Sequence, residues 1–341
     1  WFPSVPTWIW ILTASLLLIS VNAANVKLFG SIESLFSLIK VGAIFAFILL
    51  GGALIFGLGY PGLGFGHLIS HGGFLPNGWS GVWLALTLVT TSYIGVEVVA
   101  VTAGEAKNPE TAVPKALLGI VIGLVLLYGA AILVVVTVTP WPVISETGGT
   151  LSGSPFVKVF REMGIPYAGG IMNFVVLSAA LTSANTNVYL CTRMLFSLSR
   201  AGYIPKKIGE VDHRGVPLKA LLVSATGMAI AVILALRGQA AFLPLFGTAV
   251  ATMFSIWIVI FVCHIRFRRE LDPETLAGLR LKMPAHPFPS VLAILFLAAL
   301  LATTPFVAGL EWTVPFFLAW LGILAVLYRA MRGGASSADI E

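Results

Sequence analysis

The sequence predicts an all-α fold, a polytopic transmembrane helical bundle of about nine spans, and three observations support this prediction. Of the 341 residues, 58% are apolar and only 10% are charged, whereas about a quarter of a soluble domain is charged. The apolar residues form long continuous stretches, and roughly 20 such residues cross the hydrocarbon layer as a helix. Continuous stretches favour helices over a barrel, because lipid-exposed strand edges leave backbone groups unpaired.

Nine apolar stretches are predicted spans, and the loops between them contain the glycine and proline turns that end helices, as at 57–66 and 139–155. The spans are Trp8 to Ala24, Ile32 to Leu58, Gly81 to Gly104, Ala116 to Val138, Ala168 to Leu195, Leu218 to Leu236, Leu243 to Cys263, Pro289 to Val307 and Val314 to Tyr328. Cys191 and Cys263, the two cysteines, lie within these stretches, which predicts that they fill the helical core.

The net charge of +6 could indicate either nucleic-acid binding or membrane topology. Sixteen of the 20 Lys and Arg residues fall in one alternate set of loops and the C-terminal tail, which favours topology. By the positive-inside rule these loops and the C-terminus face the cytoplasm. This orientation places residue 1 outside the cell with no leader before it, so we expect an odd number of preceding spans.

Polar and small residues interrupt the third predicted span, where the run from Thr90 to Glu97 reads Thr-Thr-Ser-Tyr-Ile-Gly-Val-Glu. A helix break here would expose carbonyl and N–H groups near the membrane midplane, as interrupted helices do in transporters. A continuous helix whose small residues allow close packing fits the same run. Both interpretations stay open at this point.

Lys40 and Glu97 are charged residues within predicted spans. A charge at a helix centre costs on the order of 2.5–3.5 kcal/mol, so such residues usually face a cavity or a partner and mark ion or proton pathways. Two structural alternatives remain. The Lys40 ammonium could extend to the cytoplasmic interface along its alkyl stem, and a neutral, hydrogen-bonded Glu97 could hold two helices together.

The fifth span contains a polar series within an otherwise apolar helix. Ser178, Thr182 and Asn185 share one face by their i+4 and i+7 spacing, and Ser183 and Asn187 share a neighbouring face. Hydrogen bonds between helices and a wet, substrate-lined cavity explain this series equally well.

Several motif matches fail on their context, which leaves no predicted catalytic residue, metal site or cofactor. A GxGxxG pattern at 57–62 follows an apolar helix rather than a strand, so it predicts a loop and no nucleotide site. His67 and His71 lie four residues apart in an irregular outer loop without a carboxylate or thiol, which predicts solvated side chains. The other histidines are too scattered for a catalytic set.

The run from Gly95 to Glu110, GVEVVAVTAGEAKNPE, and the following VPKA at 113–116 closely resemble the sixth helix and next cytoplasmic loop of bacterial amino acid permeases. These permeases belong to the amino acid, polyamine and organocation (APC) transporter superfamily. The resemblance covers essentially the whole chain in the same order, through VKLFG at 26–30, LIKV at 38–41, SPFV at 154–157, GIP at 164–166, RMLFSL at 193–198 and RGVP at 214–217.

The resemblance implies a fold of two inverted five-helix repeats and two extra helices, twelve spans in all, of which the N-terminal three are absent here. Residues 1–341 would then form a single amino acid permease transmembrane domain. Within it, 1–60 would end the first repeat, 80–263 would form the second repeat, 285–330 the two extra spans and 331–341 a cytoplasmic tail. The glycine-rich break that binds the substrate carboxylate in the family lies in the absent part.

The resemblance also implies roles for residues. Carbonyls around Thr91 and Ile94 would accept hydrogen bonds from the substrate ammonium, and Tyr93 would form an aromatic wall or gate. Lys40 matches a lysine whose ammonium takes the place that sodium occupies in sodium-coupled relatives, and Glu97 matches an acidic position associated with proton coupling. The expected substrate-binding residues are Thr91, Ser92, Tyr93, Ile94, Gly95, Ser183 and Asn187.

The implied function is secondary active transport of amino acids across the bacterial inner membrane, by proton-coupled symport and alternating access. The expected partners are an amino acid, protons and the lipid bilayer, with no nucleic acid. An exchanger or a sodium-coupled symporter is the first alternative, although the Lys40 ammonium would repel a second cation. A membrane enzyme or a non-transporting fragment is the second, and the sequence leaves substrate, stoichiometry and oligomeric state open.

Overall fold

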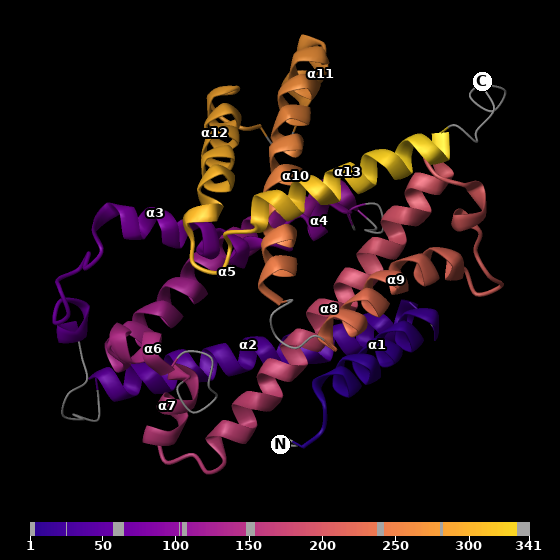
Figure 1. Ribbon diagram of the computed structural model, residues 1–341. Coiled ribbons are helices and arrows are strands. Elements are labelled where there is room, and N and C mark those ends of the chain that lie inside the picture. Colours follow the sequence, from indigo (N-terminus) through magenta and orange to yellow (C-terminus); the bar gives the residue numbers. More distant parts are fainter. Residues whose placement is uncertain are drawn as a thin grey trace. The chain divides into compact units, whose positions relative to one another are not determined.

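The computed structural model describes residues 4–24, 26–56, 65–101, 103, 108–147, 154–236, 242–279 and 282–332, and none of these residues lies in a strand (Figure 1). Seven helices in this part of the chain are long and apolar enough to cross a membrane. Two shorter apolar helices, Leu218–Leu234 and Thr313–Arg329, account for the remaining two predicted spans. The all-α, polytopic prediction is therefore confirmed.

The chain divides into two compact units, residues 1–76 with 118–232 and residues 77–117 with 233–341. The first unit contains α1 (Thr7–Ala24), α2 (Val26–Phe56), most of α5 (Pro109–Val138), α6 (Trp141–Thr147), α7 (Pro155–Glu162), α8 (Ala168–Arg200) and most of α9 (Leu218–Ala235). The second unit contains α3 (Gly78–Val89), α4 (Val98–Val101), α10 (Phe242–Glu270), α11 (Pro273–Gly278), α12 (Phe288–Thr303) and α13 (Thr313–Arg332).

The core of the first unit forms where α2, α5, α7 and α8 meet. Phe47 of α2 is fully buried, and its ring lies 4.2 Å from that of Phe156 at the start of α7. A Cβ atom at Gly51 would lie only 2.2 Å from Cγ1 of Val134, so the glycine allows α2 to approach α5 closely. Other buried members of this core are Leu54, Val138, Val157, Val159, Phe160, Ala168 and Met172.

Two side chains satisfy the last carbonyl groups of α5. Lys158 Nζ donates to the carbonyl of Val138 at 3.0 Å, and Nδ1 of His67 is hydrogen-bonded to the carbonyl of Thr137 at 2.9 Å. The final carbonyls of a helix lack partners within the helix, and a cation is favourable beside them. The prediction that both outer-loop histidines are solvated is therefore wrong for His67, whereas His71 is exposed as expected.

The core of the second unit lies between α10 and α12. Phe254 and Leu300 are fully buried there, together with Val250 and Leu297. Trp83 of α3 packs edge to face on Phe296, with the ring centroids 5.9 Å apart. These contacts pack α3, the helix before residue 90, against α10 and α12 of the same unit.

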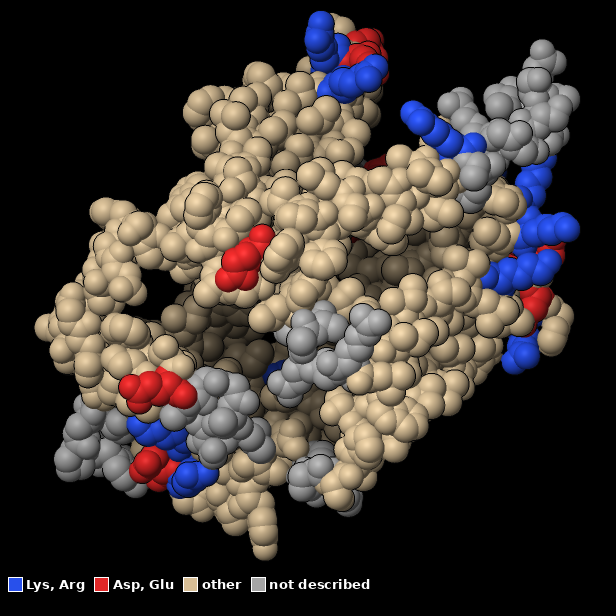
Figure 2. Space-filling model, viewed as in Figure 1, with Lys and Arg blue, Asp and Glu red and all other residues tan. Residues whose placement is uncertain are grey.

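The outer faces of the helices are apolar. Leu38 and Leu49 of α2 are 71% and 70% exposed, as expected of side chains that face acyl chains rather than a protein core. The charged side chains visible in Figure 2 gather in separate clusters, with broad uncharged areas between them. Cys191 and Cys263 also lie exposed, so the prediction that they fill the core is wrong. A lipid-facing position is as apolar as a core position, and the sequence does not distinguish the two.

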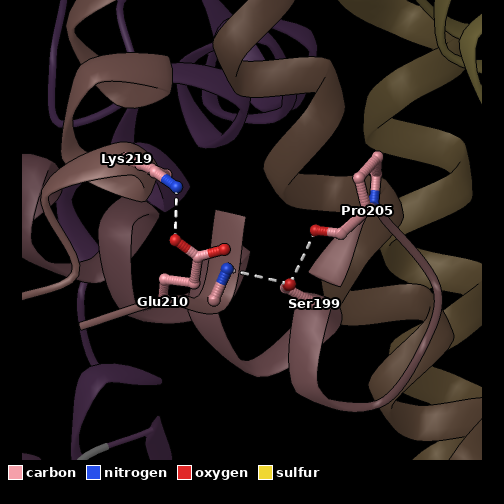
Figure 3. Close-up of polar contacts among 5 residues, drawn as sticks. Ser199, Pro205, Glu210 and Lys219 are labelled. Atoms are coloured by element: carbon pink, nitrogen blue, oxygen red, sulfur yellow. Dashed lines mark hydrogen bonds and ion pairs between the residues drawn. The ribbon is translucent and has the colours of Figure 1, made fainter. Parts of the chain in front are cut away.

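The loop between α8 and α9 folds back on the end of α8 (Figure 3). Buried Ser199 donates from its hydroxyl to the carbonyl of Pro205 at 2.8 Å and accepts from the Gly209 amide at 2.9 Å. Glu210 and Lys219 form an ion pair between this loop and the start of α9. One hydroxyl thus links two points of the loop to the helix that precedes it.

Asp212 organises the last turn of the same loop. Its Oδ1 accepts from the backbone amides of Val216 and Arg214, both at 2.9 Å. The hydrogen bond from Val216 lowers the pKa of the Asp212 carboxyl most. The Arg214 amide and the charges of His213 and Arg214 act in the same direction, against the effect of desolvation.

We expect this turn to open in acid. Because the pKa of Asp212 is lowered in the folded loop, its stabilising effect is complete above the ordinary aspartate pKa of about 3.9 and is lost as the pH falls through the lowered value. Hydrogen exchange at the Val216 amide, corrected for the intrinsic rate, should accelerate between about pH 5 and about pH 2. In Asp212→Asn the exchange should be faster at the higher pH and nearly independent of pH. Equal protection of the unmodified protein across this range would contradict the prediction.

Candidate functional site

The third predicted span is broken. α3 ends at Val89, a single 3-10 turn covers Thr90–Tyr93, and helix resumes only at α4, Val98–Val101. Ile94 is extended, with φ −60° and ψ 128°, and Gly95 has φ +110°. Only glycine adopts such a positive φ readily. Of the two interpretations that the sequence left open, the structure has the helix break and not the continuous helix.

Local hydrogen bonds explain why the helix stops here. Thr91 Oγ1 donates to the carbonyl of Leu88 at 2.5 Å, so its hydroxyl competes for a helical acceptor. Both carboxylate oxygens of Glu97 lie 3.1 Å from the Gly95 amide nitrogen, which donates to them. Glu97 thus binds the backbone of its own break, which differs from the alternative in which it holds two helices together.

Most residues of the break are exposed. Tyr93 and Ile94 are 37% and 40% exposed, Ser92 and Gly95 are also exposed, and Thr91 is half-buried. Extended and positive-φ backbone between two helical segments leaves carbonyl and amide groups outside the helical hydrogen-bond pattern. Such groups can bind the polar ends of a small zwitterion.

Lys40 contacts α8 within the first unit. Its ammonium donates to Thr182 Oγ1 at 2.7 Å, and Thr182 is only 2% exposed. The Thr182 hydroxyl itself donates to the carbonyls of Ser178 and Ala179 at 3.1 and 3.0 Å, so its lone pair is directed to the lysine. The ammonium therefore bridges α2 and α8. The structure has this bridge rather than the alternative in which the ammonium extends to the cytoplasmic interface.

A second polar bridge lies one turn further along α8. Nδ2 of Asn22, in α1, donates to Oδ1 of Asn185 at 2.9 Å, and Asn185 is 3% exposed. Ser178, Thr182 and Asn185 therefore form the buried face of α8, as their spacing predicted, and Thr182 and Asn185 bind neighbouring helices.

Ser183 and Asn187 occupy the neighbouring, exposed face of α8, also as their spacing predicted. Nδ2 of Asn187 donates to the carbonyl of Ser183 at 3.0 Å, which holds the two positions together. Their exposure leaves the Ser183 hydroxyl and the Asn187 amide oxygen accessible on this face of the first unit.

The predicted site residues thus lie in two sets. The structure brings Lys40 to α8 in the first unit, which also contains Ser183 and Asn187, and it brings Glu97 to Gly95 in the second unit. The sequence did not identify Thr182 as the partner of Lys40, or Asn22 as the partner of Asn185. Asn22 is a polar residue near the end of an apolar span, and that position was the available signal. No group of three or more potential metal ligands occurs in the part of the chain that the structure describes.

Long apolar helices, an interrupted span and a lysine bound inside the bundle define the class of the protein. They are features of a multi-pass membrane transporter, in which discontinuous helices place free backbone groups at membrane depth.

Comparison with known proteins identifies the family. The model of the amino acid permease family matches residues 1–331. The chain is 38% identical over 333 residues to YtnA, an uncharacterized amino acid permease of Bacillus subtilis, covering 96% of this chain and 71% of that protein. It is 37% identical over 330 residues to the aromatic amino acid transport protein AroP of Salmonella typhimurium, covering 95% and 70%. The chain belongs to the amino acid permease family, which confirms the resemblance seen in its sequence.

A third relative agrees with this assignment. AroP of Escherichia coli strain K12, an aromatic amino acid transport protein, is 35% identical over 332 residues, covering 96% of this chain and 71% of that protein. Membership of this family indicates a transporter of amino acids rather than an enzyme.

Proposed function

We propose that the protein moves amino acids into the cell by proton-coupled symport, with Lys40 as a proton-binding group. The observation that carries the proposal is the 2.7 Å hydrogen bond from the Lys40 ammonium to buried Thr182, which joins two membrane helices through a titratable group. Charged groups inside membrane bundles are expensive and usually mark ion or proton pathways.

The proposed cycle uses the charge of Lys40 to bias two states of the bundle. The protonated amine holds α2 against α8 through Thr182. When the proton leaves towards the cytoplasm, the charge-assisted hydrogen bond becomes a weaker neutral one, and the balance between the inward and outward states shifts. A proton from outside then restores the first state. No covalent bond to the substrate forms or breaks, and no cofactor takes part.

The proposed substrate site is the broken span. Carbonyls around Thr91 and Ile94 would bind the substrate ammonium, and the exposed Tyr93 ring would provide an apolar surface. Ser92 and Gly95 belong to the same break. Ser183 and Asn187, on the exposed face of α8 in the first unit, are proposed as further substrate-binding residues. Glu97 is proposed as a second proton-binding group, because its carboxylate binds the backbone of the break and protonation would weaken that contact.

Orientation follows from charge. The loops on the side of the α8–α9 connection carry most of the Lys and Arg residues, so we place that side and the C-terminus in the cytoplasm. The net basic charge is then a consequence of topology, and the membrane would be the bacterial inner membrane.

Uptake into proteoliposomes tests the proposed function. A panel of labelled amino acids should begin with the aromatic ones, because the AroP relatives are named aromatic amino acid transport proteins. With one proton per substrate, an inward gradient of one pH unit should support about tenfold accumulation, and a protonophore should abolish it. Accumulation driven by a sodium gradient alone would favour the sodium-coupled alternative, and exchange without net uptake would favour an exchanger.

A further inference from the structure

A cluster of basic and hydroxyl side chains joins the end of α10 to the start of α12. His264 and Arg268 lie one turn apart on α10, His286 precedes α12, and buried Ser290 lies in its first turn. Nδ1 of His264 is 3.0 Å from Ser290 Oγ, and the His264 and His286 rings meet edge to face with centroids 5.2 Å apart. We name these four residues the basic cluster.

Two nitrogen atoms of the basic cluster lack hydrogen-bond partners among the described residues. Nε of Arg268 and Nδ1 of His286 are both shielded from solvent and make no hydrogen bond there. A buried donor without a partner is destabilising, and more so when it is charged. Such atoms in a native protein call for an explanation, for which a bound group is one candidate.

The free edge of Arg268 suits an oxyanion. Nη1 donates to the carbonyl of Met283 at 3.1 Å, which uses one side of the guanidinium. The side that carries Nε is the one that binds two oxygens of a planar carboxylate or of a phosphate in parallel. His286 adds a second nitrogen from the α12 side of the basic cluster.

The acidic side chains of the same segment have other partners. Glu270 pairs with Arg266 at 3.3 Å, and Asp272 accepts from the Thr275 amide at 2.8 Å to begin α11. Glu274, in the first turn of α11, is exposed. Within the described part of the chain, therefore, Arg268 has no carboxylate of its own to fill the free edge.

The position of the basic cluster identifies the source of the anion. The spans Leu243–Glu270 and Phe288–Phe306 end and begin beside it, at the level where lipid headgroups lie. Phe267 and Phe288, the chain neighbours of the cluster, are 53% and 67% exposed and offer apolar surface to acyl chains. We infer that the basic cluster binds the phosphate group of an anionic phospholipid, as basic pockets between membrane helices do.

The segment beside the basic cluster can admit such a headgroup. Met283 binds Arg268, while Pro284, Ala285 and Pro287 of the same segment are exposed. Ala285 has a left-handed φ of +51°, a conformation that is strained for a residue other than glycine. The proposed binding includes a small rearrangement of this exposed segment that opens the Arg268 edge to a phosphate oxygen.

Lipid titration of the purified full chain in mild detergent tests the inference. Phosphatidylglycerol should raise the melting temperature and remain bound in native mass spectrometry, whereas phosphatidylcholine and inorganic phosphate should do neither. Arg268→Gln keeps an amide donor for the Met283 carbonyl but removes the charged fork. It should weaken the apparent affinity for phosphatidylglycerol about tenfold or more.

Arg269→Gln is the matched control, because it removes the same charge from the next, exposed position of α10. An equal loss of affinity in both variants, or no loss in either, would overturn the inference. Equal stabilisation by inorganic phosphate would overturn the assignment to lipid. If Arg268→Gln does not fold, His286→Phe decides the matter. It keeps an aromatic ring against His264, removes the free nitrogen and should also lower the affinity several-fold.

Discussion

Replacing Lys40 by alanine is expected to abolish amino acid accumulation driven by a proton gradient, while exchange of external for internal substrate continues. The substitution removes the titratable group that joins α2 to α8. Thr182 keeps its hydrogen bonds to the carbonyls of Ser178 and Ala179, so the fold should survive the change. Accumulation at a gradient of one pH unit should fall from about tenfold to none.

Net uptake and counterflow, measured on the same proteoliposomes, separate loss of coupling from loss of the site. Lys207→Ala is the control, because it removes the same charge from an exposed loop position and should leave uptake unchanged. Full accumulation by Lys40→Ala would contradict the proposed role of the lysine. If Glu97→Gln lost accumulation in that case, proton coupling would be assigned to the broken span.

Replacing Gly95 by alanine is expected to lower substrate affinity about tenfold to a hundredfold. The Gly95 backbone has φ +110°, and a Cβ atom there would meet no atom within 4 Å, so the cost is conformational rather than a clash. Holding a residue other than glycine in such a conformation costs on the order of 1–3 kcal/mol. The extra energy disfavours the broken geometry and therefore the arrangement of carbonyls that the substrate is proposed to bind.

Equilibrium binding of labelled substrate measures this effect directly. Gly123→Ala is the matched control, because Gly123 lies inside α5 and also has open space around its Cα. An alanine inside a helix is favoured over glycine by about 1 kcal/mol, so that variant should bind normally and melt at the same or a higher temperature. Unchanged affinity in Gly95→Ala would separate the broken span from substrate binding.

The sequence indicated the break as one of two open interpretations and predicted the faces of α8, because both features follow from local pattern. A run of hydroxyl residues before Gly95 competes with helical hydrogen bonds, and a spacing of three and four residues places Ser178, Thr182 and Asn185 on one side of a helix whatever surrounds it. The structure has both features.

The partners across helices were not predictable in this way. The contact from Lys40 to Thr182 joins positions 142 residues apart, and the contact from Asn22 to Asn185 spans 163. Only the packing of α1, α2 and α8 brings these residues together. The same reason explains the error at His67, which meets the end of a helix distant in sequence. The error at Cys191 has another cause, because an exposed position on an apolar helix has the same composition as a core position.

The two bridges to α8 respond differently to a proton. The bond between Asn22 and Asn185 joins two amides, which do not titrate in the physiological range, whereas the bond at Thr182 involves an ammonium. In the proposed cycle, a change of protonation at Lys40 would therefore loosen α2 while α1 stays fastened to the same helix. Spin labels on α1 and α8 should keep a constant separation as the pH changes, so that this pair can serve as the internal ruler against which the displacement of α2 is measured.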